Sequence, residues 1–145
     1  MAVDVVTETV IGASPHRVAE YAADPGNAPE WYANIESVEW LTEPPLRTGS
    51  RIAFVANFLG RKLAYTYEIA EYVPGRRLVM RTAQGPFPME TTYEWAAEGE
   101  STRMTLRNRG EPSGFAKVSA PVMAAAMRRA NRKDLARLKG LLEAR

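Results

Sequence analysis

If this sequence carries out acid–base chemistry, we expect a small set of its side chains to serve it. They are tyrosines and carboxylates in stretches of strand or helix periodicity: Tyr65, Tyr67, Glu71, Tyr93 and Asp134. Such groups can exchange a proton with a bound carbonyl compound. The one histidine, His16, follows Ser14-Pro15 at a predicted helix start, so we expect it to be exposed and to have a surface role.

Other kinds of chemistry lack the residues that they need. The chain has no cysteine, which excludes disulfides, thiol nucleophiles and thiolate metal sites. With one histidine and dispersed carboxylates we expect no metal, and we expect no tightly held cofactor. The sequence has no phosphate-binding glycine loop, nucleophile elbow or HExxH motif.

Length and charge further limit the classes of function that we expect. At 145 residues we predict one domain, residues 1–145. The 19 basic and 17 acidic residues give a net charge of only +2, which does not indicate nucleic-acid binding. The chain has neither a basic leader nor eighteen consecutive apolar residues, so we expect a cytoplasmic protein without stable membrane insertion.

Alternation along the predicted strands assigns side chains to an inward face. On residues 61–73 the bulkier face carries Leu63, Tyr65, Tyr67, Ile69 and Glu71. By the same rule the inward sets of the following strands are Leu78, Met80 and Thr82; Met89, Thr91, Tyr93 and Trp95; and Met104, Leu106 and Asn108. These sets suit either an ordinary core, with tyrosine hydroxyls reaching water at the sheet edge, or an apolar pocket with a few fixed polar groups.

The C-terminal segment is predicted to be one long amphipathic helix over residues 115–145, bent or interrupted near Pro121. Its apolar stripe holds Met123, Met127, Leu138, Leu141 and Leu142, and its opposite side holds Arg128, Arg129, Arg132, Lys133 and Lys139. Asn131 and Asp134 fall within the apolar stripe. Asp134 must therefore pair with an arginine at the helix edge, stay protonated, or meet water or ligand in a cavity.

Turn signals divide the rest of the chain into a characteristic order of elements. A strand at 3–11 precedes two short helical pieces, in "SPHRVAEYAAD" and "NAPEWYA", which Pro25 and Gly26 separate. Six more strands follow up to residue 110, within 34–42, 51–58, 61–73, 76–83, 89–97 and 102–110. Their links are short, so neighbours should pair antiparallel.

This layout resembles the helix-grip fold of the START/polyketide cyclase-like (SRPBCC) superfamily. The likeness spans nearly the whole chain, and its carriers are "VIGASPHRVAEYAADPGNAPEWYANIESVEWL", "YEIAEYVPGRRLVMRT" and "LARLKGLLEAR". It implies an α+β domain in which a seven-stranded curved antiparallel sheet, two short helices and a long C-terminal helix enclose a cavity. These motifs belong to the framework and identify a fold better than an activity.

The resemblance favours a protein that binds a small hydrophobic or lipid-like molecule in this cavity. The expected ligand contacts are Tyr65, Tyr67, Met80, Thr91, Tyr93, Asn108, Met127, Asn131 and Asp134. Phe58 and Leu59, at a predicted hairpin tip, should form lips of the cavity. Two alternatives stay open: an enzyme of the polyketide cyclase/aromatase or dehydratase type, and an interaction protein whose cavity is filled and whose basic helix face binds a partner. The sequence does not decide the oligomeric state.

Overall fold

The computed structural model describes residues 2–112 and 118–144, and its elements follow the predicted order. The strands are β1 (Val3–Ile11), β2 (Ile35–Trp40), β3 (Arg51–Phe58), β4 (Arg61–Val73), β5 (Arg77–Gln84), β6 (Met89–Glu98) and β7 (Ser101–Gly110). The helices are α1 (Pro15–Ala23), the short 3₁₀ turn η1 (Pro25–Asn27), α2 (Ala28–Trp31) and α3 (Ala120–Glu143). The predicted helix-grip layout is confirmed.

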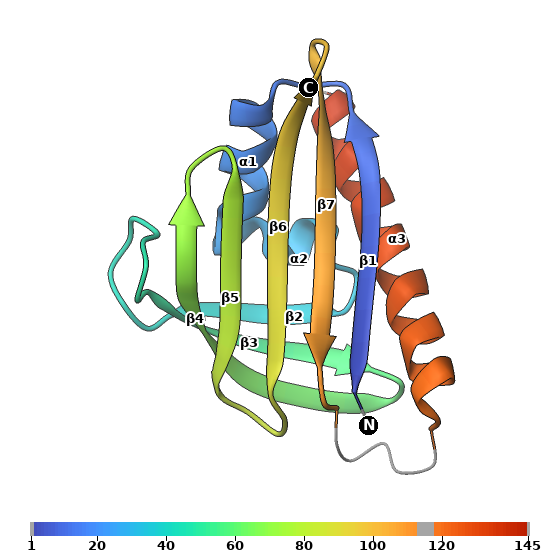
Figure 1. The fold of residues 1–145 in the computed structure, drawn as a ribbon. Helices are drawn as coiled ribbons and strands as arrows, with labels where there is room; N and C mark the ends of the chain where they lie inside the picture. Colours follow the sequence, from blue (N-terminus) through green and yellow to red (C-terminus); the bar gives the residue numbers. More distant parts are fainter. Residues whose placement is uncertain (1, 113–117, 145) are drawn as a thin grey trace.

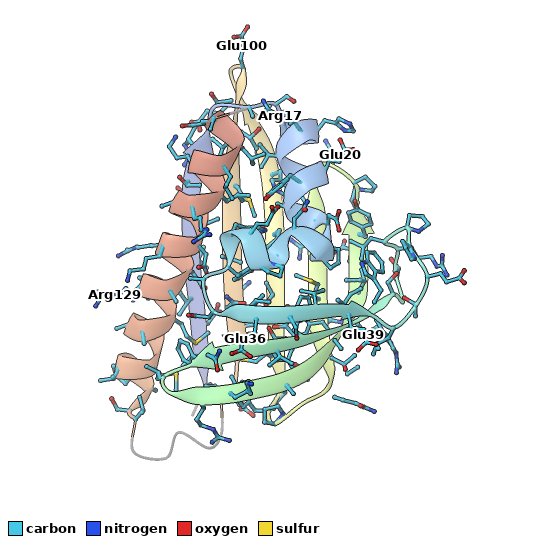
Figure 2. All side chains as sticks on the ribbon, turned by 180° about the vertical axis from the view of Figure 1, so that it is seen from behind. Arg17, Glu20, Glu36, Glu39, Glu100 and Arg129 are labelled. Atoms are coloured by element: carbon cyan, nitrogen blue, oxygen red, sulfur yellow. The ribbon has the colours of Figure 1, made fainter. Side chains whose placement is uncertain are left out.

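The seven strands form one antiparallel sheet in the order β1-β7-β6-β5-β4-β3-β2. The sheet curls so strongly that β2 and β3 run across the direction of β6 and β7, and α3 lies beside β1 (Figure 1). Seen from the other side, α1 and α2 lie over the hollow of the curl (Figure 2). The helices α1, α2 and α3 therefore lie on the concave side of the sheet.

Capping side chains and prolines explain how the chain passes from β1 into the short helices that cover the sheet. The Ser14 hydroxyl accepts a hydrogen bond from the backbone N–H of Arg17, and Pro15 occupies the first turn of α1, where its missing N–H costs nothing. Asp24 ends α1, and its carboxylate accepts a hydrogen bond from Gly26 N–H at 2.9 Å. The two short helical pieces are thus held at a fixed angle around the turn at Pro25.

Strand β4 changes its inward face partway along, and this corrects the predicted set of residues. The register against β5 shifts between Ile69 and Glu71, so the strand gains one residue there. Glu71 is consequently exposed and forms an ion pair with Arg77 at 2.7 Å, whereas Tyr72 packs against the core. Glu71 does not face the interior, and the prediction that it does was wrong.

Helix α3 begins later than predicted. Ser119 caps it by accepting from Val122 N–H, and Pro121 lies in the first turn, so no bend occurs at this proline. Residues 115–117 of the predicted helix lie outside the described part of the chain. The predicted phase of the remainder is confirmed, because Met123, Met127, Asn131, Asp134 and Leu138 are all buried.

The two halves of α3 pack into different hydrophobic clusters. The C-terminal half contributes Leu135, Leu138 and Leu142 to the large cluster beneath α1 and α2. The N-terminal half contributes Met123 and Met127 to a smaller cluster, whose other buried members are Val3, Val5 and Leu63. The two halves of α3 are therefore held by hydrophobic clusters of different size.

The outer face of the sheet is covered by paired charges. Arg107 binds Asp4 across β7 and β1, Arg103 binds Glu8 at 2.7 Å, and Arg109 binds Glu90 at 2.9 Å. These pairs are solvent-exposed on the arginine side and each contributes little to stability. They make much of the outer face a hydrated surface, on which Val6 and Val10 of β1 are also exposed.

Candidate functional site

A cavity of about 170 Å³ lies between the concave face of the sheet, α2 and α3. An engineered cavity of about 150 Å³ in another protein holds a benzene molecule, so this space has the scale of one substituted ring. Most of its lining is apolar. At one end the lining includes Phe58 from the end of β3, Phe87 from the β5–β6 hairpin, and Pro112 after β7.

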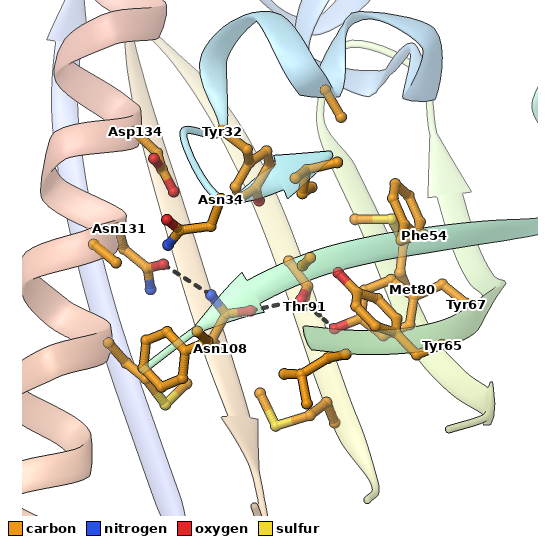
Figure 3. Close-up of a pocket in the computed structure, with 18 of the residues that line it drawn as sticks. Tyr32, Asn34, Phe54, Tyr65, Tyr67, Met80, Thr91, Asn108, Asn131 and Asp134 are labelled. Carbon is orange, nitrogen blue, oxygen red and sulfur yellow. Dashed lines mark hydrogen bonds between the residues drawn. The ribbon is translucent and has the colours of Figure 1, made fainter. Parts of the chain in front are cut away.

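All nine predicted contact residues line this cavity, and they reach it from four strands and one helix. Strand β4 supplies Tyr65 and Tyr67, β5 supplies Met80, β6 supplies Thr91 and Tyr93, β7 supplies Asn108, and α3 supplies Met127, Asn131 and Asp134 (Figure 3). Their part in binding a ligand stays a prediction. Phe58 also lines the cavity as expected of a lip, whereas Leu59 is about half exposed outside it.

A chain of hydrogen bonds crosses the cavity wall from β4 to α3. The Tyr67 hydroxyl lies 2.8 Å from Thr91 Oγ1, and Thr91 Oγ1 lies 2.5 Å from Asn108 Oδ1. Asn108 Nδ2 then donates to Asn131 Oδ1 at 3.2 Å (Figure 3). Burial raises the pKa of Tyr67 to about 12, so its hydroxyl stays protonated and serves as a donor at neutral pH.

Asn131 ends this chain with an unused donor. Its side chain is only 5% exposed, and its Nδ2 has no hydrogen-bond partner among the described residues. A buried amide N–H without a partner is unfavourable by about 1–3 kcal/mol. The structure thus keeps a polar group at the cavity that none of the described residues satisfies.

Asp134 lies one helical turn further along the same face of α3. It is 3% exposed, and its Oδ1 accepts a hydrogen bond from the backbone N–H of Ala33 at 3.2 Å. Burial raises the pKa of Asp134 to about 6, against the smaller opposing effects of this hydrogen bond and of Arg137. No ion pair to Asp134 exists within residues 2–112 and 118–144, so the predicted alternative of an arginine salt bridge is wrong.

The polar residues of the cavity that the sequence reasoning missed include Tyr32 and Asn34. The Tyr32 hydroxyl lies 2.5 Å from the Tyr93 hydroxyl, and burial raises the pKa of both groups well above the ordinary value of 10.0. Asn34 lies beside Asp134 in the same wall (Figure 3). Both follow the end of α2 at Trp31, and the only sequence signal was the Trp31-Tyr32 pair, because a loop has no periodicity from which side-chain direction can be read.

The groups expected to be peripheral lie outside the cavity. His16 is exposed and sits 3.5 Å from Glu20 on the same helix. The basic face of α3 carries Arg129, which points away from the molecule (Figure 2), together with Arg128, Arg132 and Lys133. In the described part of the chain, no three carboxylate or histidine side chains gather in a way that suits a metal ion.

None of the helices described is long and apolar enough to span a membrane.

The chain is similar to a known protein family and to several solved structures. Residues 2–143 match the family model "Polyketide cyclase / dehydrase and lipid transport". A crystal structure of a protein from Thermus thermophilus shares 25% identity with a TM-score of 0.83, and the match covers 97% of each chain. A START superfamily protein from Mycobacterium smegmatis shares 16% identity with a TM-score of 0.84, also over 97% of each chain.

An aromatase/cyclase is also similar in fold. The Zhui aromatase/cyclase from Streptomyces sp. R1128 shares 18% identity with a TM-score of 0.80, and the match covers 99% of this chain and 94% of that one. At this identity the likeness concerns the fold alone. A search of curated proteins finds no match.

Proposed function

This chain belongs to the polyketide cyclase/dehydrase and lipid transport family, and from that premise we propose that it binds a small, mainly hydrophobic molecule in the cavity between the curved sheet and α3. The observation that carries the proposal is the cavity itself. A packed protein interior leaves few voids larger than one water molecule, and this space is several times larger.

The composition of the wall supports a ligand rather than a structural void. Binding sites for small molecules combine an apolar lining with a few fixed polar groups. Here the apolar part includes Phe54, Met80 and Met127, and the polar part is the chain from Tyr67 to Asn131. The hydrogen bonds of that chain hold the polar groups in place before a ligand arrives, which reduces the entropy lost on binding.

A cavity-filling substitution tests the proposal. Ala130 lines the cavity from α3, so Ala130→Leu should occupy part of the space and weaken the binding of a small uncharged fluorescent probe such as 1-aminonaphthalene by about tenfold. Ala125→Leu is the matched control, because Ala125 is exposed on the same helix and should leave probe affinity unchanged. Equal probe affinity in both variants and the parent would contradict the proposal and favour a protein that works through its surface.

Native mass spectrometry gives an independent readout. The purified protein should retain or take up a small molecule with a stoichiometry of one, and Ala130→Leu should lower the bound fraction. A parent protein that takes up no apolar compound, in this measurement and with 1-aminonaphthalene, would refute the proposal.

A second candidate function is catalysis of the cyclase or dehydratase type on a bound carbonyl compound. Asp134 favours it, because a carboxylate whose pKa is raised to about 6 is better matched to proton transfer near neutral pH than an ordinary one. The test is exchange of the α-protons of a 1,3-diketone in D₂O, followed by NMR. Catalysis predicts protein-dependent exchange that Asp134→Asn abolishes, and exchange at the rate of buffer alone refutes it.

A further inference from the structure

We propose that the cavity selects an uncharged ring compound that offers a carbonyl oxygen to Asn131 and a hydroxyl proton to Asp134. The inference rests on the proposed function of ligand binding and adds the chemical class of the ligand. It excludes carboxylates such as free fatty acids as preferred ligands.

The direction of the hydrogen-bond chain makes Asn131 a donor toward the cavity. The 2.5 Å separation of Thr91 and Asn108 suits an O–H···O bond and is too short for the usual N–H···O bond. Thr91 therefore donates its proton to Asn108 Oδ1, and Asn108 turns its Nδ2 toward Asn131. Asn131 accepts with Oδ1, which leaves its own N–H groups for an acceptor on the ligand.

Asp134 supplies the complementary acceptor. Its Oδ1 is engaged by Ala33 N–H, and its Oδ2 has no hydrogen-bond partner among the residues described. Asn131 and Asp134 are three residues apart on α3, so they project on the same side of the helix with Cβ atoms about 5–6 Å apart. Figure 3 shows both side chains pointing from α3 toward the strands. The ligand should therefore carry its acceptor and its donor at separate positions.

The charged groups of the cavity wall argue against an acidic ligand. Among the lining residues that the structure describes there is no lysine, arginine or histidine, and Asp134 is the one ionisable carboxyl group. A ligand carboxylate would be buried without a counter-charge and close to a carboxylate of the protein, and both conditions are costly. Arg128, Arg129 and Arg132 do not compensate for this charge, because they are not among the residues that line the cavity.

Four para-substituted benzenes of similar size test the inference on the unmodified protein. Para-hydroxyacetophenone carries both groups, para-methylacetophenone only the carbonyl, para-ethylphenol only the hydroxyl, and para-hydroxybenzoate a carboxylate with the hydroxyl. We expect the first to bind most tightly by calorimetry at pH 7, where its hydroxyl group is still mostly protonated and uncharged. Loss of either group should weaken binding by about tenfold, which corresponds to about 1.4 kcal/mol, and the carboxylate should bind more weakly still.

Variants assign each effect to its residue. Asn131→Leu should weaken the two ketones and leave para-ethylphenol unaffected. Asp134→Asn should weaken para-hydroxyacetophenone and para-ethylphenol and leave para-methylacetophenone unaffected. Arg132→Gln, an exposed change on the same helix, should alter none of the affinities. The ligand series on the parent protein decides the question even if a variant fails to fold.

The outcomes separate this inference from the proposed function. Affinities within about threefold of one another, or tightest binding of para-hydroxybenzoate, would overturn the inference while the cavity remained a binding site. If none of the four compounds bound or displaced 1-aminonaphthalene, both this inference and the proposed function would fail.

Discussion

Replacing Asp134 by Asn should stabilise the protein at neutral pH. The carboxyl group is 3% exposed and has no ion pair in the described structure, and its pKa is raised from the ordinary value of 3.8 to about 6 because burial disfavours its charged form. The folded state therefore holds this proton more tightly than the unfolded state. It follows that the wild-type protein loses stability as pH rises from about 4 to about 6 and keeps this loss at higher pH.

The size of the effect follows from the difference of about two pH units between the pKa of Asp134 in the unfolded state and its pKa in the folded state. Each unit is worth about 1.4 kcal/mol, so the charged carboxylate destabilises the fold by up to about 3 kcal/mol at pH 8. Asparagine has nearly the same shape, and its carbonyl oxygen can accept the hydrogen bond from Ala33 N–H. We expect Asp134→Asn to gain about 1–3 kcal/mol at pH 8 and close to nothing at pH 4.

Urea denaturation of both proteins at pH 4, 5, 6, 7 and 8 measures this difference. The advantage of the variant should grow between pH 4 and pH 6 and then level off. A variant that is less stable than the parent at pH 8, with a deficit that grows as pH rises, would refute the reasoning and place a cation beside Asp134. Glu71→Gln serves as a control, because Glu71 is exposed and burial does not destabilise its charged form.

Three further substitutions probe the surface, the polar chain and the core. His16→Gln should change stability by less than about 0.5 kcal/mol, since His16 is exposed; a larger loss would assign it a structural role. Thr91→Val should cost about 1–3 kcal/mol, because it leaves Tyr67 and Asn108 without their shared partner, and an unchanged urea midpoint would argue against the chain. Leu138→Ala should cost about 2–5 kcal/mol at a fully buried position, and a cost below about 1 kcal/mol would contradict its place in the core.

Alternation predicted most of the cavity wall because each strand has only two faces. Once the bulky face of a strand is assigned inward, Tyr67, Thr91 and Asn108 must all point to the same space, and they do. The same argument failed after Ile69, where one additional residue reverses the alternation and turns Glu71 outward. Nothing in the local sequence marks this bulge, because it depends on how β4 pairs with β5.

Helical periodicity predicted that Asn131 and Asp134 are buried, yet it could not predict their partners. Asp134 is held by the backbone of Ala33, which is 101 residues away in the chain, and no side-chain pattern reports a backbone donor. The same limit applies to Tyr32, whose direction is set by the loop after α2 and not by a repeating pattern. Sequence thus specified the regular elements, whereas the contacts between elements needed the structure.

The division of the core into two clusters implies that the two ends of α3 differ in the free energy of local unfolding. The end near Leu138 belongs to the large cluster, whereas the end with Met123 and Met127 is held by a small one. Local opening requires less free energy where fewer apolar groups must be exposed. Amide hydrogens in the first turns of α3 should therefore exchange with solvent faster than those around Leu138. Met123 and Met127 also line the cavity, so under the proposed binding function faster opening of these turns should speed the entry and release of a ligand.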